Sequence, residues 1–382
     1  MSQPTSGPPP KRRLLGADTW PYLLSPLIPA AVVLDLLDVS AVVVFFVSAV
    51  ALIPPAAMMG RATEELAERS GNVIGGLLNV TFGNAPELII ALFALGKGLH
   101  EVVKASLIGS ILGNVLLVMG AAMLVGGLSG HRTRGVQKFG QTAASVQSTM
   151  LLLATAALIM PGVFALVKGV PLPLPGDARV HYGTNVEQLS FAVACVLIVS
   201  YAAGLLFSLR THAALFNPHE EESHIEGRGD WSTRRSVLAL AISGALVGVM
   251  SEILVGSIEA ASHSLGLSEF FIGAVIVAIV GNAAEHWVAV LVAHKNKMSL
   301  AINIAIGSSA QVALFVAPVL VLVSFILGPA PMPLVFNGLE LAGLAIAAII
   351  ANQVTQEGES TWFEGLQLLL VYLVIALTFA FA

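Results

Sequence analysis

The chain has 382 residues, of which 56% are hydrophobic and only 11% charged, with a formal net charge of −5. A typical soluble domain is about 25% charged, so this composition excludes a water-soluble globular protein. The single cysteine, Cys195, excludes an intrachain disulfide, and the nine histidines follow no Cys/His spacing that predicts a zinc site. The chain starts with the polar, Pro-rich stretch MSQPTSGPPPKRR, which predicts a short tail rather than a cleavable signal peptide.

Apolar segments follow this tail in chain order. A helix that crosses a bilayer needs about 20 apolar residues, and the first candidate, which contains Pro29 and Asp35, is the weakest. The sequence predicts an all-α polytopic membrane protein with about 11 transmembrane helices. The candidates cover residues 22–37, 40–60, 71–96, 103–128, 142–167, 187–209, 235–262, 269–293, 298–327, 333–352 and 363–381.

The basic residues predict how these spans are oriented. Eleven spans place 14 lysines and arginines on the side of the N-terminus and four, Lys97, Lys104, Lys168 and Arg179, on the other side. Cytoplasmic loops of membrane proteins carry the excess of Lys and Arg. We therefore expect a cytoplasmic N-terminus and a C-terminus outside.

The sequence contains an internal repeat. Residues 83–110, GNAPELIIALFALGKGLHEVVKASLIGS, align without a gap with residues 281–308, GNAAEHWVAVLVAHKNKMSLAINIAIGS, at an offset of 198. Five spans separate the two copies, and an odd number inverts one copy relative to the other. Inverted repeats are typical of secondary transporters, whose substrate sites lie near the bilayer midplane. We therefore predict one extra N-terminal helix plus two inverted five-helix repeats.

The repeat divides the chain into four parts. These are an N-terminal tail and extra helix at 1–38, a first repeat at 39–216, a cytoplasmic linker at 217–233 and a second repeat at 234–382. The linker is acidic, and it is either a solvated hinge or a patch that attracts or senses cations. Its acidic residues are Glu220, Glu221, Glu222, Glu226 and Asp230.

Two glutamates in the repeated motif carry the predicted chemistry. Glu87 and Glu285 lie in the middle of spans, where a charged group costs roughly 3 kcal/mol or more and is a functional candidate. Asn84 and Asn282 each precede a glutamate by three residues, which places them on the same helix face. Two carboxylates and two amide oxygens form a hard ligand set that suits Ca²⁺.

Further groups are candidates for the same site. Pro86 has no N–H, which predicts a free carbonyl on Phe82 as an additional ligand. Because Ala284 stands where the first copy has Pro86, we expect that any kink is not symmetric between the two copies. A second polar layer is either a set of ligands or a helix-packing surface. It consists of Ser110, Asn114, Ser308, Ser309 and Gln311.

Three more side chains have open roles. His286 follows Glu285 directly and either tunes protonation or faces a cavity or the headgroups. Glu64 and Glu252 belong to the related segments ATEELA and VSEILV, and we expect both at the mouth of a cation-attracting cavity.

These motifs resemble those of the calcium/proton exchangers of the calcium/cation antiporter superfamily. GNAPELI at 83–89 and GNAAEH at 281–286 look like the two signature repeats, and GSSAQVALFVAP at 307–318 is also similar. The resemblance covers nearly all of 20–382. It implies that Glu87 and Glu285 bind Ca²⁺ and exchange it for protons, with Asn84, Asn282, Ser308 and Gln311 beside them.

The resemblance implies a secondary transporter that exports Ca²⁺ from the cytoplasm by alternating access, and not an enzyme. Its partners are then Ca²⁺, protons and membrane lipid, with no cofactor and no nucleic acid, and its oligomeric state stays open. The chain lacks the long N-terminal extension of many plant vacuolar members, which favours a prokaryotic plasma membrane. The alternatives are a Na⁺/Ca²⁺ or other divalent cation exchanger on the same fold and, more remotely, a cation channel.

Overall fold

Helices dominate the computed structural model, which describes residues 19–129, 136–177, 183–212 and 231–382. The predicted N-terminal tail and the acidic residues of the linker lie outside the described residues. The described part of the chain begins with a short segment that consists of η1 (Trp20–Leu24) and α1 (Leu27–Leu36). This segment is the apolar but short counterpart of the first predicted span.

The first half continues from α2 to η4. Its elements are α2 (Ala41–Arg69), α3 (Gly71–Gly83), α4 (Ala85–Gly96), α5 (His100–Leu112), η2 (Gly113–Val118), α6 (Met119–Leu128), α7 (Gln141–Val167), α8 (Thr184–Leu206) and η4 (Phe207–Thr211).

The second half begins at α10. Its elements are α10 (Thr233–Leu265), α11 (Glu269–Phe271), η5 (Ile272–Val277), α12 (Ala278–Gly281), α13 (Ala283–His294), α14 (Met298–Gln311), η6 (Val312–Val316), α15 (Ala317–Ser324), α16 (Gly338–Thr355) and α17 (Trp362–Ala380).

Ten of the predicted spans have counterparts long and apolar enough to cross a membrane. Among the described residues, eight helices meet this criterion alone, and two more do so when each bent helix pair is taken as one span. The elements η2, η5 and η6 are π-helical turns that continue the spans around them. The helical membrane architecture predicted from hydropathy is therefore confirmed.

One feature departs from a purely helical fold. β1 (Val136–Lys138) pairs with β2 (Glu359–Thr361) in an antiparallel two-stranded sheet, with Val136 opposite Thr361. The strands lie in two connections, one from each half of the chain. They tie the two halves together at one edge of the bundle, which hydropathy alone does not predict.

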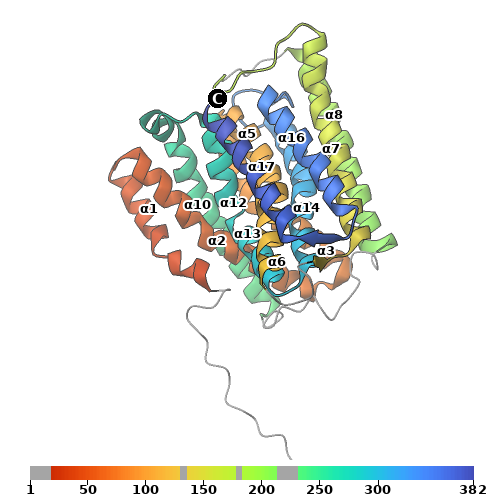
Figure 1. Ribbon diagram of the computed structural model, residues 1–382. Helices are drawn as coiled ribbons and strands as arrows, with labels where there is room; N and C mark the ends of the chain where they lie inside the picture. The colour runs from red at the N-terminus through yellow and green to blue at the C-terminus, as the bar shows by residue number, and fades with distance from the viewer. Residues whose placement is uncertain (1–18, 130–135, 178–182, 213–230) are drawn as a thin grey trace, which may run out of the picture.

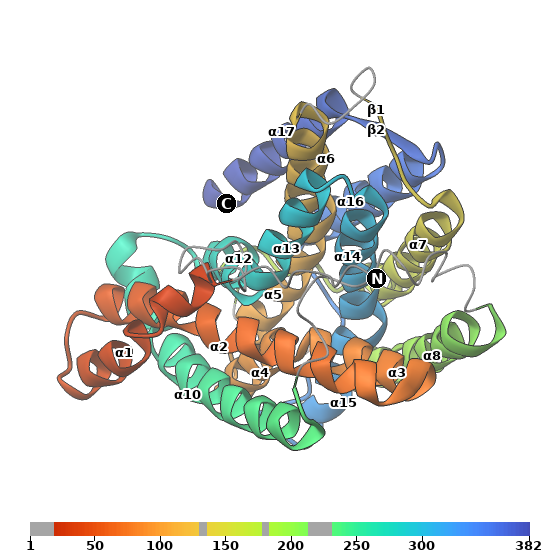
Figure 2. The same ribbon diagram turned by 90° about the horizontal axis from the view of Figure 1, so that it is seen from below.

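The spans differ in how much of each is buried within the protein. The spans His100–Leu128 and Met298–Ser324 are 78% and 72% buried within the protein, whereas Thr184–Thr211 and Trp362–Ala380 are only 22% and 17% buried. Figure 2 accordingly shows α5 and α14 near the centre of the bundle and α8 and α17 towards its outside. In Figure 1 the first described helices begin at the bottom of the molecule, while the C-terminus lies at the top.

Both copies of the repeated motif contain a broken helix. α3 and α4 meet at Asn84 with a bend of 45°, and α12 and α13 meet at Asn282 with a bend of 58°. The two bends are unequal, as expected, but the larger one lies in the copy that has Ala284 in place of the proline. The second break arises without proline, because the Asn282 side-chain amide donates to Ala278 O at 2.9 Å while its backbone N–H reaches the same oxygen only at 3.4 Å.

Candidate metal centre

A cavity of about 390 Å³ leads from one face of the protein to the two helix breaks. Pro21 and Tyr22, from the start of the described chain, line it together with Arg61. Glu87 and Glu285 are among the residues that line it. The remaining lining residues are Ala56, Ala57, Gly60, Glu64, Asn79, Gly83, Pro86, Gly281, Ala284, Trp287, Val288, Leu300, Asn303, Ile304, Ser308 and Gln311.

The two broken helices cross so that the glycine of each copy faces the glutamate of the other. A methyl group built on Gly83 would lie 3.9 Å from Glu285 Oε1, and one built on Gly281 would lie 3.5 Å from Glu87 Cγ. The two carboxyl groups are close enough to interact electrostatically. The structure therefore brings the two glutamates into one site, as the inverted repeat predicts.

The asparagines contact the serines of the opposite repeat. Asn282 Nδ2 donates to Ser110 Oγ at 3.0 Å, and Ser308 Oγ donates to Asn84 Oδ1 at 2.8 Å. Asn84 Nδ2 in turn donates to Gln311 Oε1 at 2.6 Å. Each contact joins two residues separated by more than 170 positions, so the polar layer holds the two halves of the chain together around the glutamates.

Ser308 links Asn84 of one repeat to Glu285 of the other. Its Oγ lies 2.8 Å from Asn84 Oδ1 and 3.0 Å from Glu285 Oε2, and it accepts a hydrogen bond from Asn114 Nδ2 at 3.2 Å. A hydroxyl has one proton to donate. It therefore donates to Asn84 or to Glu285 at any one time, and both acceptors lie within reach of the same hydroxyl.

Several oxygens around the cavity can serve a cation. Glu87 Oε2 and Asn282 Oδ1 are buried and have no hydrogen-bond partner among the described residues. A buried oxygen without a partner is costly, and a bound cation or a proton removes that cost. No three His, Cys, Asp or Glu side chains gather into a metal site within the described ranges, so the two carboxylates need amide and hydroxyl oxygens to complete a coordination shell.

Two further candidate groups, Phe82 and His286, lie beside the cavity without lining it. The Phe82 carbonyl is not left free by Pro86, because the helix breaks at Asn84 and the N–H of Asn84 points to Phe82 O. His286 does not line the cavity. Its Nε2 lies 3.1 Å from Asn114 Oδ1, so it contacts the polar layer behind the site.

Glu64 and Glu252, both predicted at the mouth of the cavity, lie in different places. Glu64 lines the cavity and lies close enough to Glu285 for an electrostatic interaction. Glu252 is exposed and does not line the cavity, so its placement at the mouth is wrong. The reason is helix rotation, since Glu252 lies on the same outward face of α10 as the exposed Val249, whereas Met250 and Leu254 face inward.

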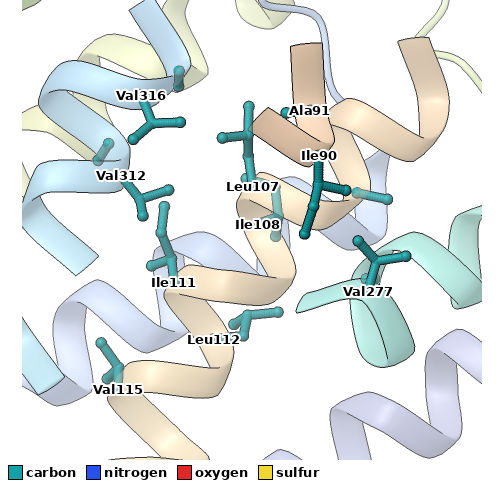
Figure 3. Packing of buried hydrophobic residues seen from close by; sticks show 14 of the residues in the cluster. Ile90, Ala91, Leu107, Ile108, Ile111, Leu112, Val115, Val277, Val312 and Val316 are labelled. Carbon is teal, nitrogen blue, oxygen red and sulfur yellow. The ribbon is translucent and has the colours of Figure 1, made fainter. Parts of the chain in front are cut away.

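The other side of the site is sealed by apolar side chains. A small pocket of about 10 Å³ lies there, bordered by Glu87, Ser110 and mostly apolar residues. Figure 3 shows Ile90, Leu107, Val277 and Val312 packed together in this region with other apolar side chains. The site is therefore open towards the face that carries the start of the described chain and closed towards the face that carries the C-terminus.

Some residues that line the cavity were not predicted from the sequence. Arg61, Asn303 and Trp287 line the cavity, but they have no counterpart at the same offset in the repeat that could single them out. Asn303 lies about one helical turn after Leu300 on α14, so both side chains can face the same cavity. Such a polar residue in an apolar span is the signal that could have identified it.

A bundle of bent helices with two carboxylates lining one buried cavity defines a polytopic membrane transporter for a cation. The family model described as "Sodium/calcium exchanger protein" matches residues 40–210 and 235–381. The chain therefore belongs to the sodium/calcium exchanger family.

Relatives and solved structures agree with this assignment. The chain is 42% identical over 354 residues to the Ca²⁺/H⁺ antiporter ChaA of Bacillus subtilis, covering 92% of this chain and 96% of that protein. It is 43% identical over 354 residues to a Ca²⁺/H⁺ antiporter of Aphanothece halophytica, covering 88% and 90%. The structure of native YfkE matches with a TM-score of 0.78 and 38% identity, covering 95% of this chain and 100% of that one.

Proposed function

We propose that this protein exchanges Ca²⁺ for H⁺ across a membrane. The observation that carries the proposal is the pair of glutamates, one from each repeat, that meet at the end of a one-sided cavity. Relatives more than 40% identical over most of the chain are Ca²⁺/H⁺ antiporters, which are transporters and not enzymes. Ca²⁺ and H⁺ are the transported ions, and no cofactor takes part.

The chemistry of the pair explains why the two ions exchange. Two carboxylates in one low-dielectric site cannot easily both ionise when the site is empty. Ca²⁺ stabilises the doubly ionised pair, whereas protons neutralise it, so the two ions compete for the same oxygens. We infer that Glu87 and Glu285 are the shared ligands, with Asn84, Asn282, Ser308 and Gln311 completing the site.

The apolar side chains that close one side of the site explain how alternating access is controlled. In the conformation described here the apolar cluster around Leu107 closes one route, while the cavity opens the other. A site that still carries an uncompensated charge resists passing through such an apolar constriction, because desolvating the charge is costly. Only a pair neutralised by Ca²⁺ or by protons changes sides, which couples the two fluxes.

The direction of transport depends on the orientation of the chain. We propose that the open face is cytoplasmic, as the excess of Lys and Arg on that side favours, and that the protein exports Ca²⁺ across a prokaryotic plasma membrane. The described halves from α2 to η4 and from α10 to α17 would then be the two inverted five-helix repeats. Cysteines placed at Asn296 and Asp177 in a Cys195→Ser background should label from opposite sides, with Asn296 labelled from the cytoplasm.

The function is tested by uptake of radioactive calcium into liposomes that contain the purified protein. An imposed pH gradient without Na⁺ should drive accumulation, and dissipating the gradient with an ionophore should abolish it. Two protons per Ca²⁺ would support roughly a hundredfold Ca²⁺ gradient per pH unit, since each proton contributes about 1.4 kcal/mol. Uptake that needs a Na⁺ gradient would favour a Na⁺/Ca²⁺ exchanger, and uptake that ignores both gradients would favour a channel.

A further inference from the structure

Asn114 lies directly behind the proposed ion site. It belongs to the π-helical turn η2, is 1% exposed and contacts two other polar side chains. Its Nδ2 donates to Ser308 Oγ at 3.2 Å, and its Oδ1 lies 3.1 Å from His286 Nε2. π-helical turns inside helices often occur at functional sites, and this turn aims an amide into the gap between α13 and α14.

The contact with Ser308 matters because of what Ser308 touches. The serine hydroxyl lies within hydrogen-bond distance of both Asn84 and Glu285. A hydroxyl rotates freely unless a partner fixes it, and it can accept and donate at the same time. By donating to Ser308, Asn114 occupies a lone pair on the far side of the oxygen and leaves the hydroxyl proton for the ion site.

This arrangement exists in only one of the two repeats. The offset of 198 relates Asn114 to Val312 and His286 to Leu88. Neither apolar side chain can form the equivalent contact. Ser110, the repeat partner of Ser308, accordingly contacts Asn282 without such a support.

We infer that Asn114 is a positioning residue for the cation site. It orients the Ser308 hydroxyl towards Asn84 and Glu285, and His286 anchors its amide from behind. Asn114 itself does not line the cavity and does not touch the ion. The inference rests on the proposed function, because it assigns Asn114 to the same site.

The test compares Asn114→Ala with Val118→Ala, which truncates another buried residue of the same π-helical turn. In uptake driven by a pH gradient, Asn114→Ala should raise the apparent KM for Ca²⁺ about tenfold, equivalent to about 1.4 kcal/mol, with the maximal rate changed less than about twofold. Val118→Ala should lower the melting temperature but leave the KM unchanged. An unchanged KM in Asn114→Ala, or an equal rise in both variants, would overturn the inference.

A double-mutant cycle separates positioning from general damage. If Asn114 acts through Ser308, the double variant Asn114→Ala/Ser308→Ala should have the same apparent Ca²⁺ affinity as Ser308→Ala alone. Additive losses of affinity would contradict this route. Asn114→Leu, which keeps most of the volume, replaces the alanine variant if that variant does not fold. Failure of both to fold would show a structural role and overturn the inference.

Equilibrium Ca²⁺ binding in detergent distinguishes this inference from the proposed function. If the wild-type protein binds Ca²⁺ but shows no uptake driven by a pH gradient, the proposed exchange is wrong. Weaker binding by Asn114→Ala would still support the positioning role in that case. If the wild-type protein transports Ca²⁺ and Asn114→Ala binds it normally, only the positioning role is wrong.

Discussion

The two copies of the repeated motif occupy equivalent places but have different surroundings. Glu285 contacts Ser308, which is in turn supported by Asn114. Glu87 has a buried Oε2 without a hydrogen-bond partner in the described part of the chain and borders the apolar seal. Duplication therefore supplies the pair of carboxylates, while residues outside the shared motif determine how each carboxylate is held.

The largest expected effect comes from removing either carboxylate. Glu87→Gln and Glu285→Gln should each abolish Ca²⁺ uptake driven by a pH gradient, although their surroundings differ. Glutamine keeps the volume and one ligand oxygen but removes the charge, and weak screening in a low-dielectric site makes that charge worth several kcal/mol. Near-normal uptake by either variant, shown to be folded by gel filtration, would contradict a shared site.

A pair of repeat-related glycines tests the packing around the site. A methyl group on Gly109 would clash with the backbone oxygen of Ala274, whereas one on Gly307 would lie 3.6 Å from the Gln147 side chain. Gly109→Ala should therefore lower stability by at least about 1–3 kcal/mol, as overpacking does. Gly307→Ala should purify normally. Thermal unfolding in detergent measures the difference, and equal melting temperatures would show that the close packing of α5 against η5 is wrong.

The repeat-related serines Ser308 and Ser110 should contribute unequally to Ca²⁺ affinity, which equilibrium binding in detergent measures. Ser308 contacts both Asn84 and Glu285, whereas Ser110 contacts Asn282. Loss of a hydrogen bond to a buried polar group costs about 1–3 kcal/mol, so Ser308→Ala should weaken Ca²⁺ binding roughly tenfold. Ser110→Ala should weaken it less. The reverse order would indicate that the ion lies nearer to Ser110 than the hydrogen bonds suggest.

The smallest effect is expected at an acidic residue away from the cavity. Glu252 is exposed on α10, whereas Glu64 lines the cavity and interacts with Glu285. Glu252→Gln should change uptake less than about twofold, while Glu64→Gln should raise the KM for Ca²⁺ because the mouth attracts cations less strongly. A loss of transport in Glu252→Gln would assign a function to the outward face of α10.

Much of this fold could be predicted from hydropathy and the repeat. The apolar segments fixed the order of the helices, and the offset of 198 between Glu87 and Glu285 predicted that they meet. The bend at Asn282 was not predicted, because a proline is a visible signal and a side-chain amide that competes with its own helix is not. The position of Glu252 depended on the rotation of α10, which a span with apolar residues on every face does not reveal.

Contacts between residues far apart in the sequence could not be predicted either. His286 was an open assignment because its partner, Asn114, lies 172 residues away. The repeat offset cannot relate the two, since Asn114 corresponds to Val312 and His286 to Leu88. Features shared by the two copies were therefore predictable from sequence, whereas the features that make them different required the structure.

The most direct test of the central claim is the release of protons when Ca²⁺ binds. Purified protein in weakly buffered detergent at mildly acidic pH, with a pH-sensitive dye, should release about two protons per bound Ca²⁺, because metal ligands must be deprotonated. Ca²⁺ affinity should rise with pH for the same reason, and any Ca²⁺ that Glu87→Gln or Glu285→Gln still binds should displace at most about one proton. Stoichiometric Ca²⁺ binding by the wild-type protein without proton release at any pH would contradict a single site shared by Ca²⁺ and H⁺.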